Sequence, residues 1–490
     1  MFNKLNEECG VFGVYNNDDH DVAGLSYYAL YALQHRGQES CGIAINRDGI
    51  IRGHKNLGLV NEVFDQKTLK SLGQGKMAIG HCRYATCGQG MISNAQPLMI
   101  NHLKGSMAIA HNGNLTNTGE LRRELELGGA IFQGTSDTEV IAYILTKQRL
   151  SSNSIEEAIS KTMNIIKGAY CLLVMSPKKL IAARDPYGIR PLSIGKLGDS
   201  YMIASETCAL ESNGATFVRD VLPGEIVVID ETGLKSITTH VSNKCHLCVF
   251  EFVYFARPDS VIEGSCVQTA RQRAGTYLAL EHPVQADVVI GVPDSGLDAA
   301  LGFSKQSGIP YGVGLLKNKY VGRTFIQPDQ IQREKAVRIK LNPIASALKD
   351  KRVVLIDDSI VRGTTSKRIV QLIRDAGAKE VHMRISAPPF KYPCYFGTDV
   401  DTQENLIAWH MSIEEIAKEI GVDSLGYLSV QDVKKIATNS ACDYCVGCFT
   451  GEYPMEVPKG SQKHICEIPL GAEKTAEYEY DMEVEDNEEF

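Results

Sequence analysis

The second half of the chain alternates short apolar runs with amphipathic stretches, a pattern typical of a parallel α/β sheet. Val353–Ile356 is a run of apolar, largely β-branched residues, which predicts a strand covered on both faces. Apolar side chains then recur with helical spacing until Gly377, which is expected to end the helix; they are Ile369, Val370, Leu372 and Ile373. An earlier strand is predicted at Ala286–Val292, followed by a helix at Leu297–Lys305.

In the first half, shorter apolar runs are separated by turns. They predict strands at Ala169–Met175, Leu180–Ala183, Tyr201–Ala204 and Glu225–Ile229, in addition to a first strand beginning at Cys9 and a helix at Tyr27–Leu33. We interpret the later strands as the scaffold of a first domain and assign no chemistry to the turns at Arg184–Leu192 and Ser205–Thr207.

Length, charge and cysteine content limit the classes of protein to which this chain can belong. A chain of 490 residues predicts about two to four domains. Its net charge of −8 argues against nucleic-acid binding. The polar N-terminus resembles no signal peptide, and no apolar run approaches the ~20 residues of a membrane span, so we expect a cytoplasmic protein without a membrane partner. In that compartment disulfides are not expected, and the 14 cysteines are expected to be catalytic, metal-bound or buried.

The stretch after Val353–Ile356 predicts a phosphate site. Two carboxylates, Asp357 and Asp358, follow the strand at the end where ligands bind in α/β sheets. Small and hydroxyl residues then precede the helix, where backbone N–H groups can close on a phosphate; they are Gly363, Thr364, Thr365 and Ser366. Ser359 and Arg362 of the same stretch are included in the candidate site. Because carboxylates repel phosphate, we expect the acidic pair to face sugar hydroxyls or hydrated Mg²⁺. The alternative interpretation of this stretch is a solvated turn followed by a capped helix. No Walker A pattern is present, so ordinary hydrolysis of a nucleoside triphosphate is not indicated.

This stretch resembles the phosphoribosyl-pyrophosphate (PRPP) motif of type I phosphoribosyltransferases. The resemblance implies that the loop of Asp294, Ser295 and Gly296 binds the pyrophosphate, and that Ser295 joins Asp357 and Asp358 around Mg²⁺. A basic segment follows, and we interpret Lys317, Lys319 and Arg323 as a lid that closes on pyrophosphate and excludes water. A solvated basic face is the alternative, above all for the later cations Arg333, Lys335, Arg338 and Lys340.

Four motifs in the first half fit a glutaminase when they are taken together. Alone, Cys9 could be a buried strand residue, Arg83 a surface cation, Asn112-Gly113 a hairpin turn and Asp137 a helix cap. A glutaminase needs a thiolate, an oxyanion hole, a cation for the substrate carboxylate and an anion for its ammonium group. In their order along the chain and in their residues, the motifs resemble those of the N-terminal-nucleophile (Ntn) glutamine amidotransferase domain, which is an αββα sandwich.

That resemblance implies a role for each residue. Cys9 is the nucleophile, the Asn112 side chain and the Gly113 N–H form the oxyanion hole, Arg83 binds the carboxylate and Asp137 the ammonium. The base is the free α-amine of the nucleophile, whose pKa near 8 suits that task. Because eight residues precede Cys9, we predict a propeptide that is removed between Glu8 and Cys9.

Several cysteines form a third candidate site, one that could bind a metal. A set of thiolates without a well-placed histidine fits either Zn²⁺ or an iron–sulfur cluster, and spacing alone does not decide. Resemblance to an iron–sulfur branch of the family implies a structural [4Fe–4S] cluster on Cys248, Cys394, Cys445 and Cys448. Cys245 and Cys442 are additional, and either could substitute as a ligand.

From Cys9 to about Gly451 the chain resembles the glutamine PRPP amidotransferase family, of the propeptide-bearing iron–sulfur kind. We therefore expect a propeptide (1–8), a class II glutamine amidotransferase domain (9–240), a type I phosphoribosyltransferase domain (241–450) and a C-terminal tail (451–490) that is acidic and disordered after Gly471. The family's reaction converts glutamine and PRPP to 5-phosphoribosylamine, pyrophosphate and glutamate at the start of purine synthesis. It also implies a homotetramer inhibited by purine nucleotides.

Two other functions fit parts of the sequence. A different sugar-phosphate amidotransferase would share the Cys9 half, but the stretch from Asp357 to Ser366 speaks against it. A non-enzymatic PRPP or nucleotide sensor with a redox cluster would not need the glutaminase residues.

Overall fold

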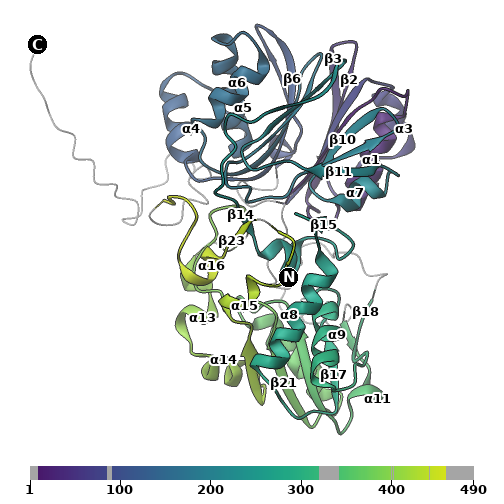
Figure 1. The fold of residues 1–490 in the computed structure, drawn as a ribbon, viewed down its shortest axis with the longest axis vertical. Coiled ribbons are helices and arrows are strands. Elements are labelled where there is room, and N and C mark those ends of the chain that lie inside the picture. The colour runs from purple at the N-terminus through teal and green to yellow at the C-terminus, as the bar shows by residue number, and fades with distance from the viewer. Residues whose placement is uncertain are drawn as a thin grey trace, which may run out of the picture.

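A computed structural model describes residues 9–84, 91–318, 341–398, 400, 402–440 and 442–458. The predicted propeptide, the lid residues Lys319 and Arg323, the later basic residues Arg333 to Lys340 and the tail after Gly471 lie outside these ranges. Two domains are stacked along the long axis of the molecule, the N-terminal one above the other in Figure 1.

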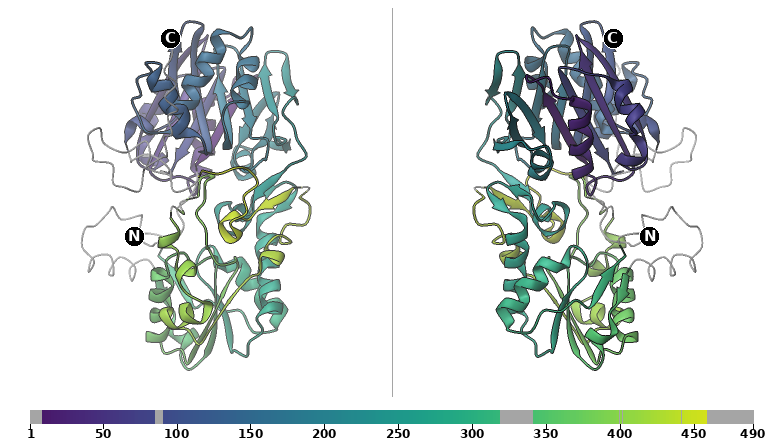
Figure 2. Two further views of the ribbon diagram at one scale, coloured as in Figure 1. Left: turned by 90° about the vertical axis from the view of Figure 1, so that its left-hand side faces the viewer. Right: turned by 90° about the vertical axis from the view of Figure 1, so that its right-hand side faces the viewer.

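Two antiparallel sheets form the first domain. One has the order β11 (Thr216–Asp220), β9 (Ser193–Leu197), β10 (Ser200–Ala204), β1 (Gly10–Tyr15), β4 (Met77–Arg83), β2 (Ser40–Arg47) and β3 (Ile50–Leu57). The other has the order β13 (Gly233–Ile237), β12 (Ile226–Asp230), β8 (Leu180–Arg184), β7 (Gly168–Met175), β6 (Gly105–Leu115) and β5 (Leu98–His102). The sheets lie face to face between layers of helices (Figure 2).

Side chains alternate between the two faces of each strand, and this alternation builds the layers. On β1, Val11 and Tyr15 pack between the sheets with Ile79 and Leu173, whereas Phe12 packs outward against the first helix layer. That layer holds α1 (Val22–Ala32), α2 (Val60–Val63), α3 (Gln66–Leu72) and α7 (Thr207–Glu211). On the other sheet lie α4 (Thr118–Leu127), α5 (Asp137–Leu150) and α6 (Ile155–Met163). The predicted αββα sandwich is confirmed.

The second domain is built on the parallel sheet β17 (Val288–Gly291), β20 (Arg352–Asp357), β21 (Glu380–Ile385) and β22 (Ser424–Tyr427). Val354 and Ile356 of β20 pack toward α8 (Val267–Glu281) and α9 (Gly296–Ser307). Val353 and Leu355 pack toward α12 (Thr364–Asp375) and α14 (Ile413–Ile420). The predicted strand covered on both faces, and the predicted α/β class, are confirmed.

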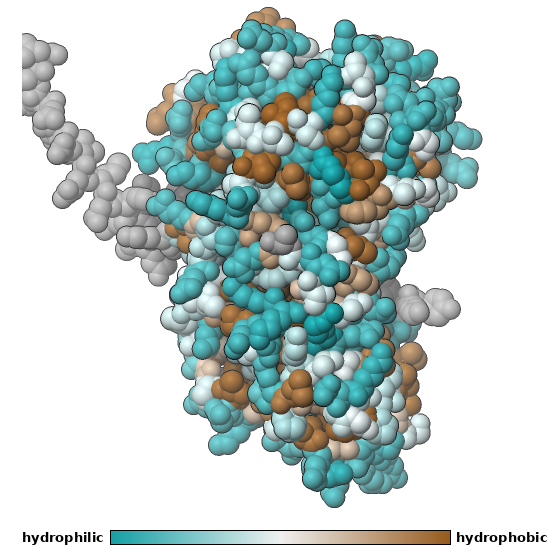
Figure 3. Space-filling model, viewed as in Figure 1, coloured by the Kyte–Doolittle hydropathy of each residue, from teal (hydrophilic) through white to brown (hydrophobic). Residues whose placement is uncertain are grey.

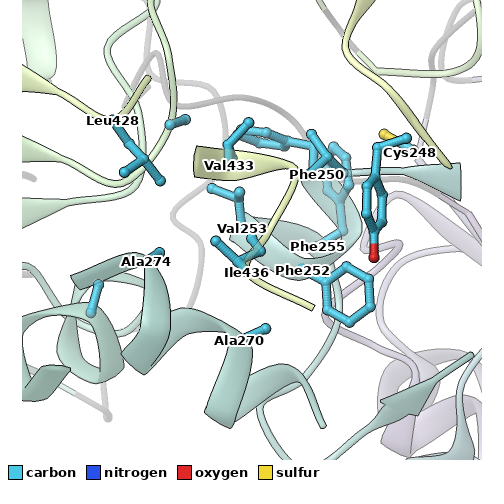
Figure 4. Close-up of a cluster of buried hydrophobic side chains, with 14 of the residues drawn as sticks. Cys248, Phe250, Phe252, Val253, Phe255, Ala270, Ala274, Leu428, Val433 and Ile436 are labelled. Atoms are coloured by element: carbon cyan, nitrogen blue, oxygen red, sulfur yellow. The ribbon is translucent and has the colours of Figure 1, made fainter. Parts of the chain in front are cut away.

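Shorter elements complete this domain. They are β15 (Val261–Ile262), β16 (Ser265–Cys266), β18 (Leu315–Lys317), β19 (Leu341–Pro343), α11 (Ala345–Leu348), α13 (Ile407–His410) and α15 (Val430–Val433). A short π-helical turn, η2 (Glu251–Phe255), carries a group of aromatic side chains into the core, where Phe250 and Phe255 approach to 5.2 Å between ring centroids (Figure 4).

The expectation that the chain contains no disulfide is wrong. Cys245 and Cys442 form a disulfide, with their Cα atoms 4.8 Å apart. The reason is local: β14 (His246–Cys248) and β23 (Asp443–Cys445) pair in parallel, and each cysteine lies one residue before its strand. That separation is within the range that a disulfide spans.

The start of the segment that we assigned to the tail belongs to the core. Tyr453, Met455 and Val457 pack against the hydrophobic cluster of the second domain, and the Tyr453 hydroxyl donates to the Pro393 carbonyl at 2.6 Å. Polar and apolar residues are interspersed over the face of both domains seen in Figure 3. No helix in the described part of the chain is long and apolar enough to cross a membrane.

Candidate active sites

The central strands of the first sheet place the predicted nucleophile beside the predicted carboxylate receptor. Strand β1 pairs with β4 so that Gly10 lies opposite Cys82, which brings Cys9 next to Arg83. The Cys9 thiol donates to the Tyr84 carbonyl, with 3.6 Å between sulfur and oxygen. Arg83, which is 3% exposed, also donates to Glu39 at 3.2 Å.

Burial raises the pKa of the Cys9 thiol to about 11, although the Arg83 guanidinium acts in the opposite direction. Asp137 and Glu39 are also close enough to raise this pKa, so both carboxylates lie near the sulfur. A thiol in such surroundings is protonated at neutral pH and needs a base before it can attack.

The second sheet supplies the oxyanion-hole candidates. Asn112 and Gly113 lie within β6, so the alternative interpretation of a hairpin turn is wrong. Gly113 has φ of +140°, and a Cβ there would lie 2.1 Å from the Ala169 carbonyl oxygen, so this position requires glycine. The Asn112 side chain lies 3.4 Å from the Ser205 hydroxyl, and its buried Oδ1 has no partner within the described structure.

Asp137 is the first residue of α5, and Ser136 rather than Asp137 caps that helix. Its carboxylate accepts a hydrogen bond from the Leu115 N–H at 3.1 Å and lies 3.4 Å from His111 Nδ1. Burial alone would raise the pKa of this carboxyl, but His111 and the Leu115 N–H hold it below its usual value. A charged carboxylate is therefore maintained where an ammonium group is expected.

The predicted phosphate and pyrophosphate loops meet at one edge of the second sheet. Strands β17 and β20 are parallel neighbours, with Gly291 opposite Ile356, so the loops that follow them are adjacent. The Ser295 hydroxyl donates to one oxygen of Asp358, and the Ser359 hydroxyl to the other. A Cβ on Gly296 would lie 2.4 Å from the Ile356 carbonyl oxygen, so this close approach depends on glycine.

A small pocket opens between the end of β20 and the start of α12. It is lined by Asp357, Ser359, Ile360, Val361, Gly363, Thr365 and Ser366. Gly363 adopts φ of +78° and ψ of −21° at the N-cap of α12. Exposed Lys317 forms an ion pair with Asp294 beside these loops. Arg362 and Thr364 are exposed neighbours of the pocket residues.

The four predicted cluster cysteines also come together. Cys248 and Cys445 are register partners in the β14–β23 pair, and Cys448 lies in α16 (Gly447–Thr450). Burial raises the pKa of the Cys448 thiol, and the neighbouring thiols of Cys394, Cys248 and Cys445 raise it further. None of the four is in a disulfide. Within the described ranges, no group of three or more His, Cys, Asp or Glu side chains is arranged to hold a metal ion.

A buried ion-pair network beside Cys9 escaped sequence analysis. It joins Arg36 and Arg190 to Glu206 and Glu251, and all four side chains are fully buried. Arg36 lies in the polar stretch directly after the predicted helix Tyr27–Leu33, and no role was assigned to it from the sequence. The other three gave no signal, because their partners are far away in sequence.

Comparison with known proteins bears on both domains. Residues 81–212 match a family model described as a glutamine amidotransferase domain, and residues 274–389 match one described as a phosphoribosyl transferase domain. Amidophosphoribosyltransferase of Bacillus subtilis (strain 168) is 48% identical over 458 residues, which covers 92% of this chain and 95% of that protein. The chain belongs to the amidophosphoribosyltransferase family.

Further members of this family are similarly close. Amidophosphoribosyltransferase of Methanocaldococcus jannaschii is 50% identical over 464 residues, which covers 92% of this chain and 98% of that protein. Among solved structures, the PRPP amidotransferase from B. subtilis complexed with ADP and GMP has a TM-score of 0.85 at 47% identity, over 92% of this chain and 99% of that one. A structure described as the allosteric regulatory enzyme of purine biosynthesis has a TM-score of 0.87 at 47% identity, over 94% of this chain and all of that one.

The predicted function, glutamine-dependent amidotransfer to PRPP in purine synthesis, is therefore confirmed, as is the class of enzyme. The amidophosphoribosyltransferase family combines a glycosyltransferase with a glutamine amidotransferase activity, and this chain has both domains.

Proposed function

We propose that Cys9 releases ammonia from glutamine and that the ammonia displaces pyrophosphate from C1 of PRPP at the second domain. The observation that carries the first half of this proposal is a buried thiol with Arg83 and Asp137 close enough to shift its pKa. Asn112 approaches from the facing sheet, where its side chain lies 3.4 Å from the Ser205 hydroxyl that accepts a hydrogen bond from the Val11 N–H. Arg83 binds the substrate α-carboxylate and Asp137 its α-ammonium, which directs the carboxamide carbon toward the sulfur. The Asn112 amide and the Gly113 N–H donate to the oxygen that becomes negative when the sulfur attacks.

The base in this proposal is the α-amine of Cys9. A thiol with a pKa of about 11 requires a base close by. An α-amine has a pKa near 8 and becomes available only after cleavage between Glu8 and Cys9. We therefore infer that residues 1–8 are a propeptide. An intact-mass measurement of active protein that still contains Met1–Glu8 would be incompatible with this inference.

In the second domain, the 5-phosphate of PRPP binds the backbone and hydroxyls of residues 363–366 at the N-terminus of α12, and Arg362 adds a positive charge there. The ribose hydroxyls face Asp357 and Asp358, and Ser359 orients Asp358. Asp294, Ser295 and Gly296 bind the pyrophosphate. Lys317 closes on it together with Lys319 and Arg323, which lie outside the described residues.

The donor set at this edge fits Mg²⁺. The carboxylates of Asp357 and Asp358 are each 1% exposed and adjacent, and Ser295 donates to Asp358, so hard oxygen ligands are gathered where the pyrophosphate is expected. Bound Mg²⁺ would neutralise the charge that develops on departing pyrophosphate.

We also propose that Cys248, Cys394, Cys445 and Cys448 hold a [4Fe–4S] cluster. Support comes from four reduced thiols, three of which lie close enough to Cys448 to raise the pKa of its thiol, in an apolar core that includes Phe250, Phe390 and Phe449. The disulfide removes Cys245 and Cys442 as substitute ligands. Such a cluster would tie the end of the chain to the start of the second domain. Anaerobically purified protein should contain about four iron and four sulfide per chain; zinc without sulfide would contradict the cluster.

Regulation and assembly are part of the proposal. The B. subtilis relative was solved with ADP and GMP, and we infer that purine nucleotides bind and inhibit this chain. We further propose a homotetramer in the cytoplasm.

The decisive experiment measures pyrophosphate release from PRPP and Mg²⁺ with either glutamine or ammonium chloride as nitrogen donor. Cys9→Ala should lose the glutamine-driven release and retain the ammonium-driven release, because the mutation removes the nucleophile and leaves the PRPP site intact. The glutamine analogue 6-diazo-5-oxo-norleucine should label wild-type Cys9. A Cys9→Ala protein that still uses glutamine would overturn the proposal.

A further inference from the structure

The second domain makes a direct, fully buried contact with the residue that carries the nucleophile. Arg36 follows α1 in the first domain, and its Nε donates to the main-chain carbonyl of Cys9 at 3.0 Å. Its other two nitrogens donate to the two oxygens of Glu251, at 2.9 and 2.8 Å. Glu251 begins η2 of the second domain. One guanidinium thus connects Cys9 to the second domain.

A second path of contacts leads from the same carboxylate through Arg190 and Phe396 toward Gly113. Glu251 lies 3.4 Å from Arg190 Nη1, and Arg190 Nη2 donates to the Phe396 carbonyl at 2.7 Å. The segment around Phe396 lies against Gly113, because a Cβ on Gly397 would be 3.6 Å from the Gly113 carbonyl carbon. The next residue of β6, Asn114, donates to the Tyr395 carbonyl at 2.9 Å.

Two guanidinium groups in this network face Glu251 and Glu206, and the His35 imidazole lies 2.7 Å from Glu206. Buried ion pairs contribute little net stability, so a hydrophobic interface would hold the two domains together at least as well. This network instead ends on the nucleophile at one side and beside the oxyanion hole at the other. That placement favours a role in catalysis over a role in holding the domains together.

We propose that Glu251 is a positioning residue for the glutaminase reaction, supplied by the phosphoribosyltransferase domain. Through Arg36 it fixes the carbonyl, and hence the Cα and sulfur, of Cys9. Through Arg190 it fixes the segment that supports Gly113. The glutaminase geometry is therefore complete only when the second domain is docked. This inference rests on the proposed role of Cys9.

The test compares wild type with Glu251→Gln, which keeps the shape of the side chain and removes its charge. Glu225→Gln is a matched control, because Glu225 is also fully buried and accepts from both terminal nitrogens of one arginine, Arg219, at 2.8 and 2.7 Å. Glutamate formation from glutamine and pyrophosphate release with ammonium chloride are measured on the full chain.

For Glu251→Gln we expect kcat for glutamine to fall about 10- to 100-fold, the effect of a displacement of about 1 Å at a reacting group. The KM for glutamine should change by less than about threefold, because Arg83 and Asp137 are untouched. Ammonium-driven release should be unchanged. The control should keep all three values.

Unchanged glutamine turnover in Glu251→Gln would overturn the inference, and so would an equal loss of both activities, which indicates a purely structural role. Arg36→Lys is a second variant, which keeps the charge but cannot hold the Glu251 carboxylate and the Cys9 carbonyl at once. It should also lower kcat for glutamine and leave ammonium-driven release unchanged. A wild type without glutamine-driven turnover would instead refute the proposed function itself.

Discussion

Gly363 offers a sharp test of the phosphate site, because its backbone conformation is one that only glycine adopts at little cost. It has φ of +78°, and a Cβ there would lie 2.7 Å from Ile407 Cδ1. An L-residue in this left-handed region costs about 1–2 kcal/mol. In Gly363→Ala the loop can relax in the free protein and must regain its strained shape to bind PRPP.

If that whole cost appears on binding, the KM for PRPP should rise about 5- to 30-fold, since 1.4 kcal/mol corresponds to a factor of ten. The assay is pyrophosphate release with ammonium chloride as donor, so that the glutaminase does not limit the rate. Glutamine hydrolysis should be unaffected.

Gly421→Ala is the matched control. Gly421 has φ of +80° at the end of α14, and a Cβ there would meet only Val370 Cγ1, at 4.0 Å. It carries the same backbone strain away from the pocket, so it should lower the melting temperature and leave the KM for PRPP within about twofold. An unchanged KM in Gly363→Ala, or an equal rise in both variants, would refute the assignment of this loop to phosphate.

Two further predictions concern the glutaminase. Asn112→Ala should lower kcat for glutamine about 10²- to 10³-fold by removing one oxyanion donor; ammonium-driven release serves as the internal control, and a loss below about tenfold would contradict the role. Because burial disfavours the thiolate and raises the pKa of Cys9 to about 11, its alkylation by iodoacetamide should keep accelerating, roughly tenfold per pH unit, from pH 8 to 10. Peptide mass mapping isolates the Cys9 signal, and a rate that levels off above about pH 9.5, as expected for an ordinary thiol with a pKa near 8.5, would exclude the raised pKa.

Elements with a strong local signal were predictable from sequence. The apolar run at Val353–Ile356 had to be a buried strand, and a parallel sheet brings the ends of neighbouring strands to one edge, so Asp358 and Ser295 meet. The closeness of Cys9 and Arg83 was expected only through the family resemblance, because it depends on the register of two antiparallel strands that lie far apart in sequence.

Features that depend on distant partners were not predictable. Pairing of Cys245 with Cys442 follows from the alignment of β14 with β23, and nothing in either local sequence indicates it. Arg190 lies in a turn to which we assigned no chemistry, and its importance appears only when Phe396 and Glu251 are placed around it. Long-range contacts of this kind are set by the docking of two domains, which residue pattern alone does not determine.

The disulfide also changes the covalent connectivity of the molecule. Its two cysteines are 197 residues apart in sequence, and the strands and helices of the parallel-sheet domain lie on the loop of chain between them. A protease that cuts this loop once converts a closed ring into two arms that stay linked through sulfur. The nicked protein gains only the mass of one water and stays a single covalent species until a reductant is added; only then does it separate into two fragments under denaturing conditions.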